Sequence, residues 1–177
     1  MLAEAACELF LEKGYAATSV ADITERAGVS RNTFFNYIPT KSDLLWTSVD
    51  DAVADLTEAL ADPGGTDGDP VARVRTALLG VAADIEPGTV ALAFANAEPM
   101  GVVEELEESA ARRQAAVGRV VAGYLRRSRT EDLTAEVLGT ALAGAFLASL
   151  RAWARTPVPR PALPEVLTRA LDVVAPD

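Results

Sequence analysis

The side chains best suited to chemistry form one short run. Arg31, Asn32 and Thr33, followed by Asn36 and Tyr37, supply a guanidinium, two amides and two hydroxyls on the outward side of a predicted helix. Guanidinium and amide groups hydrogen-bond in pairs to base edges in a major groove, and hydroxyls bond to phosphate oxygens. The run therefore predicts a surface that can recognise a duplex nucleic acid.

Two short helices joined by a tight turn would present this run. Thr18 or Ser19 can cap the first helix and Ser30 the second, because a side-chain oxygen there accepts a free backbone N–H. Gly28 permits the turn between the two helices, and Phe34 points inward from the second. This arrangement is a helix-turn-helix pattern.

Composition argues against most enzymes. The 177 residues include no histidine and a single cysteine, Cys7, so an imidazole base, a His/Cys metal set and an internal disulfide are all missing. The net charge of −10 disfavours a protein that coats polyanions everywhere, although residues 18–41 are slightly positive. We expect no catalytic residue, no metal and no cofactor.

Apolar spacing predicts an all-α protein of about nine helices, since sustained strand alternation is nearly absent. A surface loop is expected over residues 62–70, where turn-forming residues gather. The longest charge-free apolar run, residues 137–150, is shorter than the roughly 20 residues that span a bilayer, so we expect a cytoplasmic protein without a membrane segment. The predicted helices are 2–13, 20–27, 31–38, 42–60, 71–85, 88–97, 100–128, 131–156 and 163–175.

Further motifs surround the helix pair. They are Leu9-Phe10, Glu12-Lys13-Gly14-Tyr15, Thr18-Ser19-Val20, Ile23, Ala27-Gly28-Val29-Ser30, Thr33-Phe34-Phe35, Tyr37, and Thr40-Lys41 with Leu44. Over residues 2–46 they closely resemble the TetR family of bacterial transcriptional regulators. The resemblance implies a three-helix DNA-binding domain over residues 1–46 and a ligand-binding and dimerisation domain over residues 47–177. It also implies a homodimer that binds a palindromic operator.

The resemblance carries roles onto individual residues. Base readers would be Arg31, Asn32 and Asn36, by the pairing of arginine with guanine and of asparagine with adenine. The other implied DNA contacts are Ser19, Ser30, Thr33, Phe35, Tyr37 and Lys41. For Ser19 and Ser30 the alternative is a capping role alone, and for Phe35 it is packing with partial groove contact. Family members usually carry a basic stretch before the first helix, and this sequence begins at Met1-Leu2. Either this start is genuine or the sequence lacks its N-terminal arm. Because the helix pair itself holds few basic residues, we expect few phosphate contacts and a weak dependence of binding on salt.

The helix predicted at 131–156 is apolar nearly all round, so both of its sides must be covered. Its small residues Gly139, Ala143, Gly144 and Ala148 permit close helix approach. We assign one side to the partner subunit of a homodimer, together with the helix at 163–175, and the other side to a ligand pocket. The alternative is an ordinary monomer core.

The candidate pocket residues are apolar side chains of the middle helices and two polar ones. An apolar lining with a hydroxyl and an amide predicts a lipophilic ligand that carries one or two hydrogen-bonding groups. Each residue is equally consistent with ordinary core. The candidates are Leu78, Val81, Phe94, Asn96, Met100, Val117, Val121, Tyr124, Phe146 and Trp153.

Arginines are frequent beyond residue 111, and two interpretations stay open for them. They could meet an anionic group at a pocket mouth, or they could form a solvated helix face, with the acidic residues of 104–108 paired to Arg112 and Arg113 at helical spacing. The arginines concerned are Arg112, Arg113, Arg119, Arg126, Arg127 and Arg129.

A weaker resemblance covers the C-terminal half. The segment 119–126, followed by Asp132-Leu133 and by Arg151-Ala152-Trp153, is similar to the C-terminal domain of mycofactocin-system-type TetR regulators. That domain is associated with acyl-CoA binding, so an acyl-CoA or fatty-acyl effector is one candidate and another lipophilic effector is the alternative.

Taken with the resemblance, the sequence predicts a ligand-responsive regulator, most simply a repressor that a small lipophilic effector releases from its operator. The alternative is a helical protein-interaction module that binds no specific DNA. Such a module would have no need for the polar face that begins at Arg31.

Overall fold

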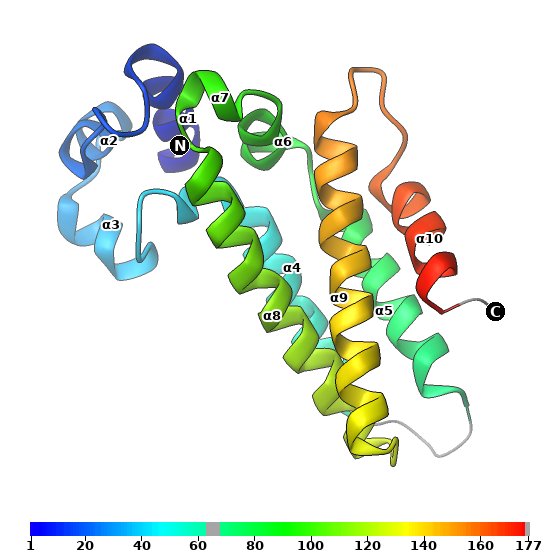
Figure 1. The fold of residues 1–177 in the computed structure, drawn as a ribbon. Helices are drawn as coiled ribbons and strands as arrows, with labels where there is room; N and C mark the ends of the chain where they lie inside the picture. The colour runs from blue at the N-terminus through cyan, green and yellow to red at the C-terminus, as the bar shows by residue number, and fades with distance from the viewer. Residues whose placement is uncertain (63–67, 176–177) are drawn as a thin grey trace. The chain divides into compact units, whose positions relative to one another are not determined.

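The computed structural model describes residues 1–62 and 68–175, and within them the chain is helical without a strand (Figure 1). The predicted all-α class is confirmed, with ten α-helices and one 3-10 helix described where about nine helices were expected. Most of the predicted loop at 62–70 lies outside the described residues. The elements are α1 Leu2–Lys13, α2 Val20–Ala27, α3 Arg31–Tyr37, η1 Asp43–Trp46, α4 Thr47–Ala59, α5 Pro70–Asp84, α6 Gly88–Ala95, α7 Ala97–Met100, α8 Val103–Arg127, α9 Asp132–Arg155 and α10 Leu163–Val174.

Two predicted helices are each divided in the structure. The helix expected over 42–60 starts as the 3-10 turn η1, and α4 begins only at Thr47. The Asp43 carboxylate accepts both the hydroxyl and the backbone N–H of Thr40, at 2.7 and 3.2 Å, and so caps that turn. The helix expected over 100–128 is interrupted at Gly101, whose positive φ of 65° ends α7 before α8 begins.

The chain forms two compact units. The first contains residues 1–48 and 87–109, and the second contains residues 49–86 and the chain from Ala110 onward. Helices α4 and α8 each begin in the first unit and continue into the second. Compactness thus groups α6 and α7 with the helix-turn-helix, although 38 residues of chain lie between Ser48 and Pro87.

Aromatic contacts hold the first unit together. Phe10 of α1 meets the Tyr15 ring edge-on at 5.1 Å, and Trp46 of η1 meets Phe94 of α6 at 5.5 Å. The backbone N–H of Tyr15 donates to the carbonyl oxygen of Met100 at 2.8 Å. Phe10 and Trp46 are fully buried, so α6 and α7 complete the core beneath the helix-turn-helix.

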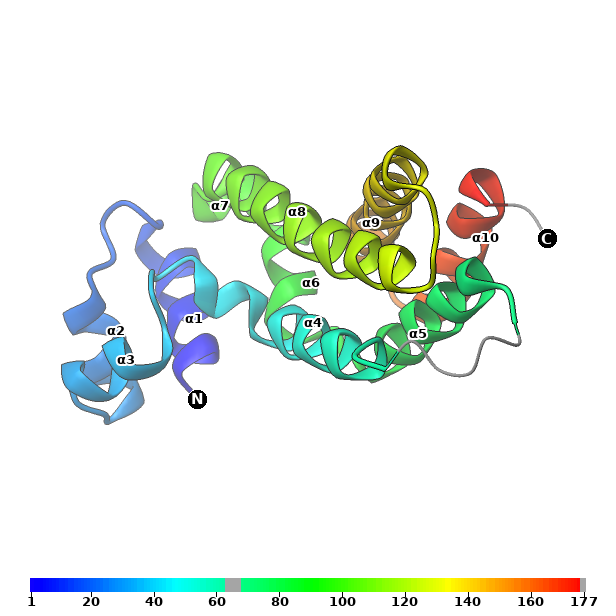
Figure 2. The ribbon, with the colours of Figure 1, turned by 90° about the horizontal axis from the view of Figure 1, so that it is seen from below.

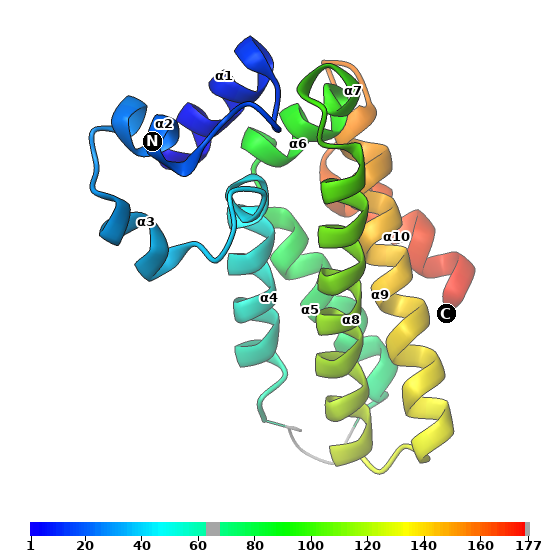
Figure 3. The same ribbon diagram turned by 60° about the vertical axis from the view of Figure 1, so that its left-hand side comes forward.

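Close helix packing organises the second unit. Helix α9 lies between α8 and α10, and α10 also packs on α5 (Figures 2 and 3). A Cβ atom at Gly139 would lie 2.7 Å from the carbonyl oxygen of Gly118, so α8 and α9 touch through backbone. An ion pair between Arg75 and Asp172, at 2.6 Å, links α5 to α10.

By length and composition α9 could cross a membrane. Half of its most apolar window is buried inside the protein, as in the core helix of a soluble domain.

Candidate functional site

Side-chain oxygens cap the start of α2, and a glycine ends the helix. The Ser19 hydroxyl accepts the Asp22 backbone N–H at 3.2 Å, and the Asp22 carboxylate accepts the Ser19 backbone N–H at 2.7 Å. Lys13 lies 2.9 Å from the same carboxylate, and together these partners hold the pKa of Asp22 well below its ordinary value. Gly28 then ends α2 with a φ of 69°, which lets the chain turn sharply toward α3.

Helix α3 is anchored by one aromatic side chain and exposes the rest of its predicted face. The Ser30 hydroxyl accepts the Thr33 backbone N–H at 3.1 Å and so caps the helix. Phe34 is fully buried, whereas Phe35 is 60% exposed and Tyr37 is 78% exposed. The side chains of Arg31, Asn32, Thr33 and Asn36 are exposed as well. The structure therefore brings the predicted base-reading groups onto one accessible helix.

Most cations near this helix already have partners. Arg26 pairs with Glu12 at 2.9 Å and with Glu8 at 3.1 Å, and Lys13 pairs with Asp22. Within residues 1–48, all of which the structure describes, Arg31 is the one Lys or Arg without an ion pair or a backbone partner. Its charge is therefore fully available to a bound anion.

Lys41 is held inside the unit. Its Nζ donates to the carbonyl oxygens of Tyr15 and Thr18 at 2.6 and 2.8 Å, and it lies 3.9 Å from the centre of the Tyr15 ring. Burial lowers the pKa of the ammonium. Two of its three donors thus tie the segment before η1 to the turn between α1 and α2, which leaves one donor for a phosphate.

The hydroxyls of Ser19 and Ser30, for which capping alone was the alternative to a DNA contact, both act as helix caps. Ser19 and Ser30 each accept an N–H of their helix, and the Ser30 and Thr33 hydroxyls share a hydrogen bond of 2.8 Å. A hydroxyl that accepts one hydrogen bond keeps further capacity, so capping leaves the phosphate role of these residues as a prediction.

The ten predicted pocket residues fall into two groups. Phe94, Asn96 and Met100 belong to the first unit, where Phe94 packs on Trp46 and the Asn96 amide donates to the Leu92 carbonyl oxygen at 2.9 Å. The other seven belong to the second unit and are buried there. These seven are Leu78, Val81, Val117, Val121, Tyr124, Phe146 and Trp153.

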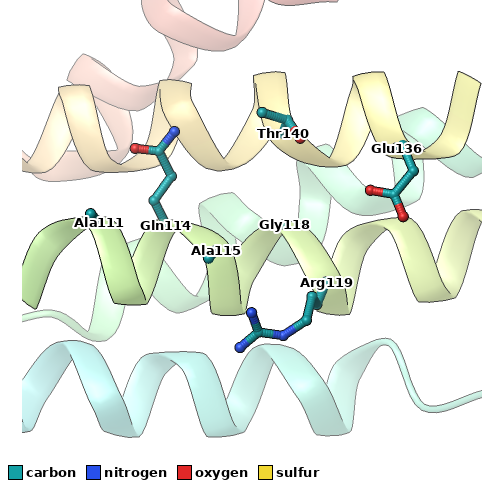
Figure 4. Close-up of a pocket in the computed structure, with 7 residues that line it drawn as sticks. All are labelled: Ala111, Gln114, Ala115, Gly118, Arg119, Glu136 and Thr140. Atoms are coloured by element: carbon teal, nitrogen blue, oxygen red, sulfur yellow. The ribbon is translucent and has the colours of Figure 1, made fainter. Parts of the chain in front are cut away.

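A hollow of about 430 Å³ lies between α8 and α9 at the surface of the second unit (Figure 4). None of the ten predicted pocket residues lines it. Gln114 reaches from α8 toward α9, and Arg119 extends away from α9. The residues that line this hollow are small or polar: Ala111, Gln114, Ala115, Gly118, Arg119, Glu136 and Thr140.

Sequence reasoning did not find the ion pair that joins α4 to α8. Arg113 pairs with Asp50 of α4, with Nε 2.8 Å from Oδ1 and Nη2 2.5 Å from Oδ2. Arg127 donates to the Leu60 carbonyl oxygen at 2.7 Å, and Arg126 pairs with Asp132 and Glu136 of α9. Helical spacing pointed only to partners on the same helix, because contacts between helices leave no periodic signal in a sequence.

Cys7 offers no reactive thiol. It is buried in α1, and burial raises its pKa to about 12, so the thiol stays protonated at neutral pH. Among residues 1–62 and 68–175 no group of three or more His, Cys, Asp or Glu side chains could hold a metal ion.

Comparisons with known proteins agree with this geometry. Residues 2–46 match the bacterial regulatory proteins of the tetR family, and residues 68–177 match the MftR C-terminal domain. No curated protein shows a significant match.

Two solved structures are similar to most of the chain. Thermus thermophilus FadR, a TetR-family transcriptional repressor in complex with lauroyl-CoA, is 27% identical with a TM-score of 0.59, over 98% of this chain and 91% of that one. Native NalD of Pseudomonas aeruginosa, the secondary repressor of the MexAB-OprM multidrug efflux pump, is 20% identical with a TM-score of 0.59, over 98% and 92%.

These relatives are transcriptional regulators rather than enzymes. Members of this family bind DNA operators as dimers and respond to small molecules. The match to the MftR C-terminal domain alone covers more than half of the chain, and the N-terminal match covers the helix-turn-helix described above. The chain belongs to the TetR family of bacterial transcriptional regulators, with a DNA-binding helix-turn-helix and a C-terminal domain of the MftR type.

Proposed function

We propose that this protein is a cytoplasmic repressor that binds a palindromic operator as a homodimer and is released by a lipophilic, acyl-CoA-like effector. Residues 1–46 bind DNA, and residues 47–177 bind the effector and the second subunit. The exposed face of α3 carries the proposal. The side chains of Arg31, Asn32 and Asn36 are exposed and can contact base edges, and the buried Phe34 anchors the helix that carries them.

The electrostatics of the first unit support sequence-specific binding over bulk attraction. Arg31 carries the one unengaged positive side chain of residues 1–48, and acidic partners neutralise Arg26 and Lys13. The affinity of a protein for phosphates falls with salt in proportion to the number of contacts. We expect a shallow salt dependence, with hydrogen bonds to base edges supplying most of the selectivity.

The surface of α9 supports the homodimer. The stripe that faces away from the protomer core includes Leu133 at 69% exposure and Val137 at 58%, and it continues through the exposed Ala148 and Ala152. An apolar stripe of this kind is expected to be covered. Gly139 and Ala143 are buried within the protomer, so the partner would meet the neighbouring small residues of α9 together with α10.

Two observations support an acyl-CoA-like effector. The chain is similar to a repressor whose structure contains lauroyl-CoA, and its C-terminal residues match the MftR domain. We place the effector's apolar part among the buried residues of the second unit, such as Val81, Val117 and Phe146. A ligand acts only if it binds the DNA-incompetent form more tightly, and the coupling is typically about 1–3 kcal/mol.

The experiment is selection of bound duplexes from a random library by the purified protein, by its Arg31→Ala variant and by an Arg119→Ala control. Arg119 is exposed on α8 and its loss changes the net charge equally. We expect the wild type and the control to enrich one palindrome and Arg31→Ala to lose it. Equal enrichment by all three proteins would contradict base reading by α3.

Failure of the wild type to enrich any sequence, also with an N-terminally extended protein, would favour the helical protein-interaction module. Once an operator is known, lauroyl-CoA and free dodecanoic acid can be titrated into the complex. Release by lauroyl-CoA alone identifies the acyl-CoA class, and release by both identifies the acyl chain as the recognised part. Release by neither contradicts the proposed effector class.

A further inference from the structure

Asp50 of α4 and Arg113 of α8 form a two-point ionic contact between two helices of the second unit. The guanidinium meets the carboxylate with two parallel hydrogen bonds of 2.8 and 2.5 Å. The Arg113 side chain is 9% exposed, whereas that of Asp50 is 47% exposed. Because a two-point contact between planar groups fixes rotation as well as distance, this pair defines how α4 is turned against α8.

In the sequence, both residues of the ion pair come a few positions after a point where the chain passes from the first unit to the second. The chain passes between the two compact units at residues 48–49, 86–87 and 109–110. The first and third of these crossings lie inside the continuous helices α4 and α8. Asp50 follows the first crossing by two residues and Arg113 follows the third by four. The ion pair therefore joins the two helical connections at the point where both enter the second unit.

A second contact fixes the far end of α4. Arg127, in the last turn of α8, donates to the Leu60 carbonyl oxygen at 2.7 Å. Helices α4 and α8 run in the same direction side by side (Figure 3). With contacts at both ends, α4 cannot rotate about its own axis without breaking one of them.

We propose that Asp50 and Arg113 are positioning residues that set the half-site spacing that the dimer accepts on DNA. This inference rests on the proposed function, because it requires a palindromic operator. An ion pair with one exposed partner contributes little net stability, but its two-point geometry favours one register over its neighbours. Because α4 begins in the first unit and continues into the second, we expect a change in the register of α4 to change the half-site spacing that the dimer accepts.

The experiment compares two duplexes. One carries the palindrome enriched by the wild type, and the other carries one extra base pair at its centre, which moves one half-site by about 3.4 Å and turns it by about 35°. The ratio of the two Kd values measures discrimination of spacing. We expect Asp50→Asn to lower this ratio by about fivefold or more. The control is Asp51→Asn, an exposed neighbour on α4, which should leave the ratio unchanged.

Because Asp50→Asn removes the Asp50 carboxylate from a guanidinium that is 9% exposed, the Tm of this variant is expected to fall as well. A second variant separates folding from positioning. The double variant Asp50→Leu with Arg113→Met replaces the two-point contact by apolar side chains, so its Tm should stay near that of the wild type while its ratio of Kd values falls.

The inference is overturned if either variant keeps the wild-type ratio, if Asp51→Asn lowers the ratio equally, or if the wild type itself does not discriminate between the duplexes. If the wild type enriches no palindrome, the proposed function fails first and this inference falls with it. The two failures are thus distinguishable by the wild-type selection alone.

Discussion

The two compact units are built by different interactions. In the first unit short helices end at side-chain caps, and single groups such as the Lys41 ammonium bond to backbone carbonyl oxygens. In the second unit the long helices α8 and α9 meet through Gly118 and Gly139, with a continuous apolar core behind them. Polar local bonds therefore define the first unit, and shape complementarity defines the second.

This difference explains how each unit serves the family's function. A recognition helix must present the same donors to DNA every time, and directional hydrogen bonds with one buried anchor achieve this. An effector domain must accommodate an apolar molecule and change shape with it. Apolar packing has little directional preference, so several arrangements of similar energy are accessible.

The largest expected effect contrasts two neighbouring aromatic residues of α3. Phe34→Ala should lower the free energy of unfolding by about 3–5 kcal/mol, because it empties a fully buried site. Phe35→Ala should change it by about 0.5 kcal/mol or less, since the ring is 60% exposed, and should instead weaken operator binding. Urea unfolding and DNA titration measure the two quantities, and equal losses of stability would contradict the assigned orientation of α3.

A medium effect contrasts two glycines of the second unit. Gly139→Ala should destabilise the protein by about 1–3 kcal/mol, because the new Cβ would lie 2.7 Å from a backbone oxygen of α8. Gly80 is an exposed position of α5, and no atom lies within 4 Å of a Cβ added there. Gly80→Ala should therefore stabilise the protein by up to about 1 kcal/mol. Opposite shifts in Tm are expected, and a Gly139→Ala variant at least as stable as the wild type would contradict the backbone contact between α8 and α9.

The smallest effect concerns pH and the cap of α2. The pKa of Asp22 in the folded protein lies below its ordinary value of 3.8, chiefly through Lys13 and then the Ser19 N–H. Its contribution to stability is therefore fully present above that ordinary value and is lost as the pH falls through the lower folded-state value. The Tm difference between wild type and Asp22→Asn should accordingly stay constant from about pH 6 to about pH 4 and shrink as the pH falls further, to about pH 2.

The control for this titration is Glu25→Gln, on the same helix. Glu25 is exposed and its carboxylate makes no ion pair with the described residues. A Tm difference for Asp22→Asn that stays constant across the range, or a pH-dependent one of equal size for Glu25→Gln, would contradict the capping role.

The three helices of residues 1–41 could be predicted from sequence nearly to the residue. Ser19 and Ser30 cap the helices expected of them, and Gly14 and Gly28 end the helices before them. The errors lie where a local signal has two solutions. Ser42 and Asp43 are both capping residues, and the Thr40 bonds to Asp43 select a 3-10 turn before α4.

The second unit could be predicted only in outline. The helix boundaries follow from prolines and apolar spacing, but ten candidate pocket residues could not be divided between pocket and core, and three of them belong to the other unit. Apolar side chains carry the same signal whether they face a ligand, a partner or a neighbouring helix. Arg113 likewise gave no sign that its carboxylate lies on α4.

The sequence by itself determined the helical class, the helix-turn-helix and the polar face of α3, because caps, turns and helix faces depend on residues a few positions apart. Only the tertiary structure decided that residues 87–109 share a core with the helix-turn-helix, that Lys41 bonds to carbonyl oxygens, and that Asp50 meets Arg113. Those contacts join residues between 23 and 85 positions apart. Which distant groups meet depends on the packing of all the helices together, and no local pattern records it.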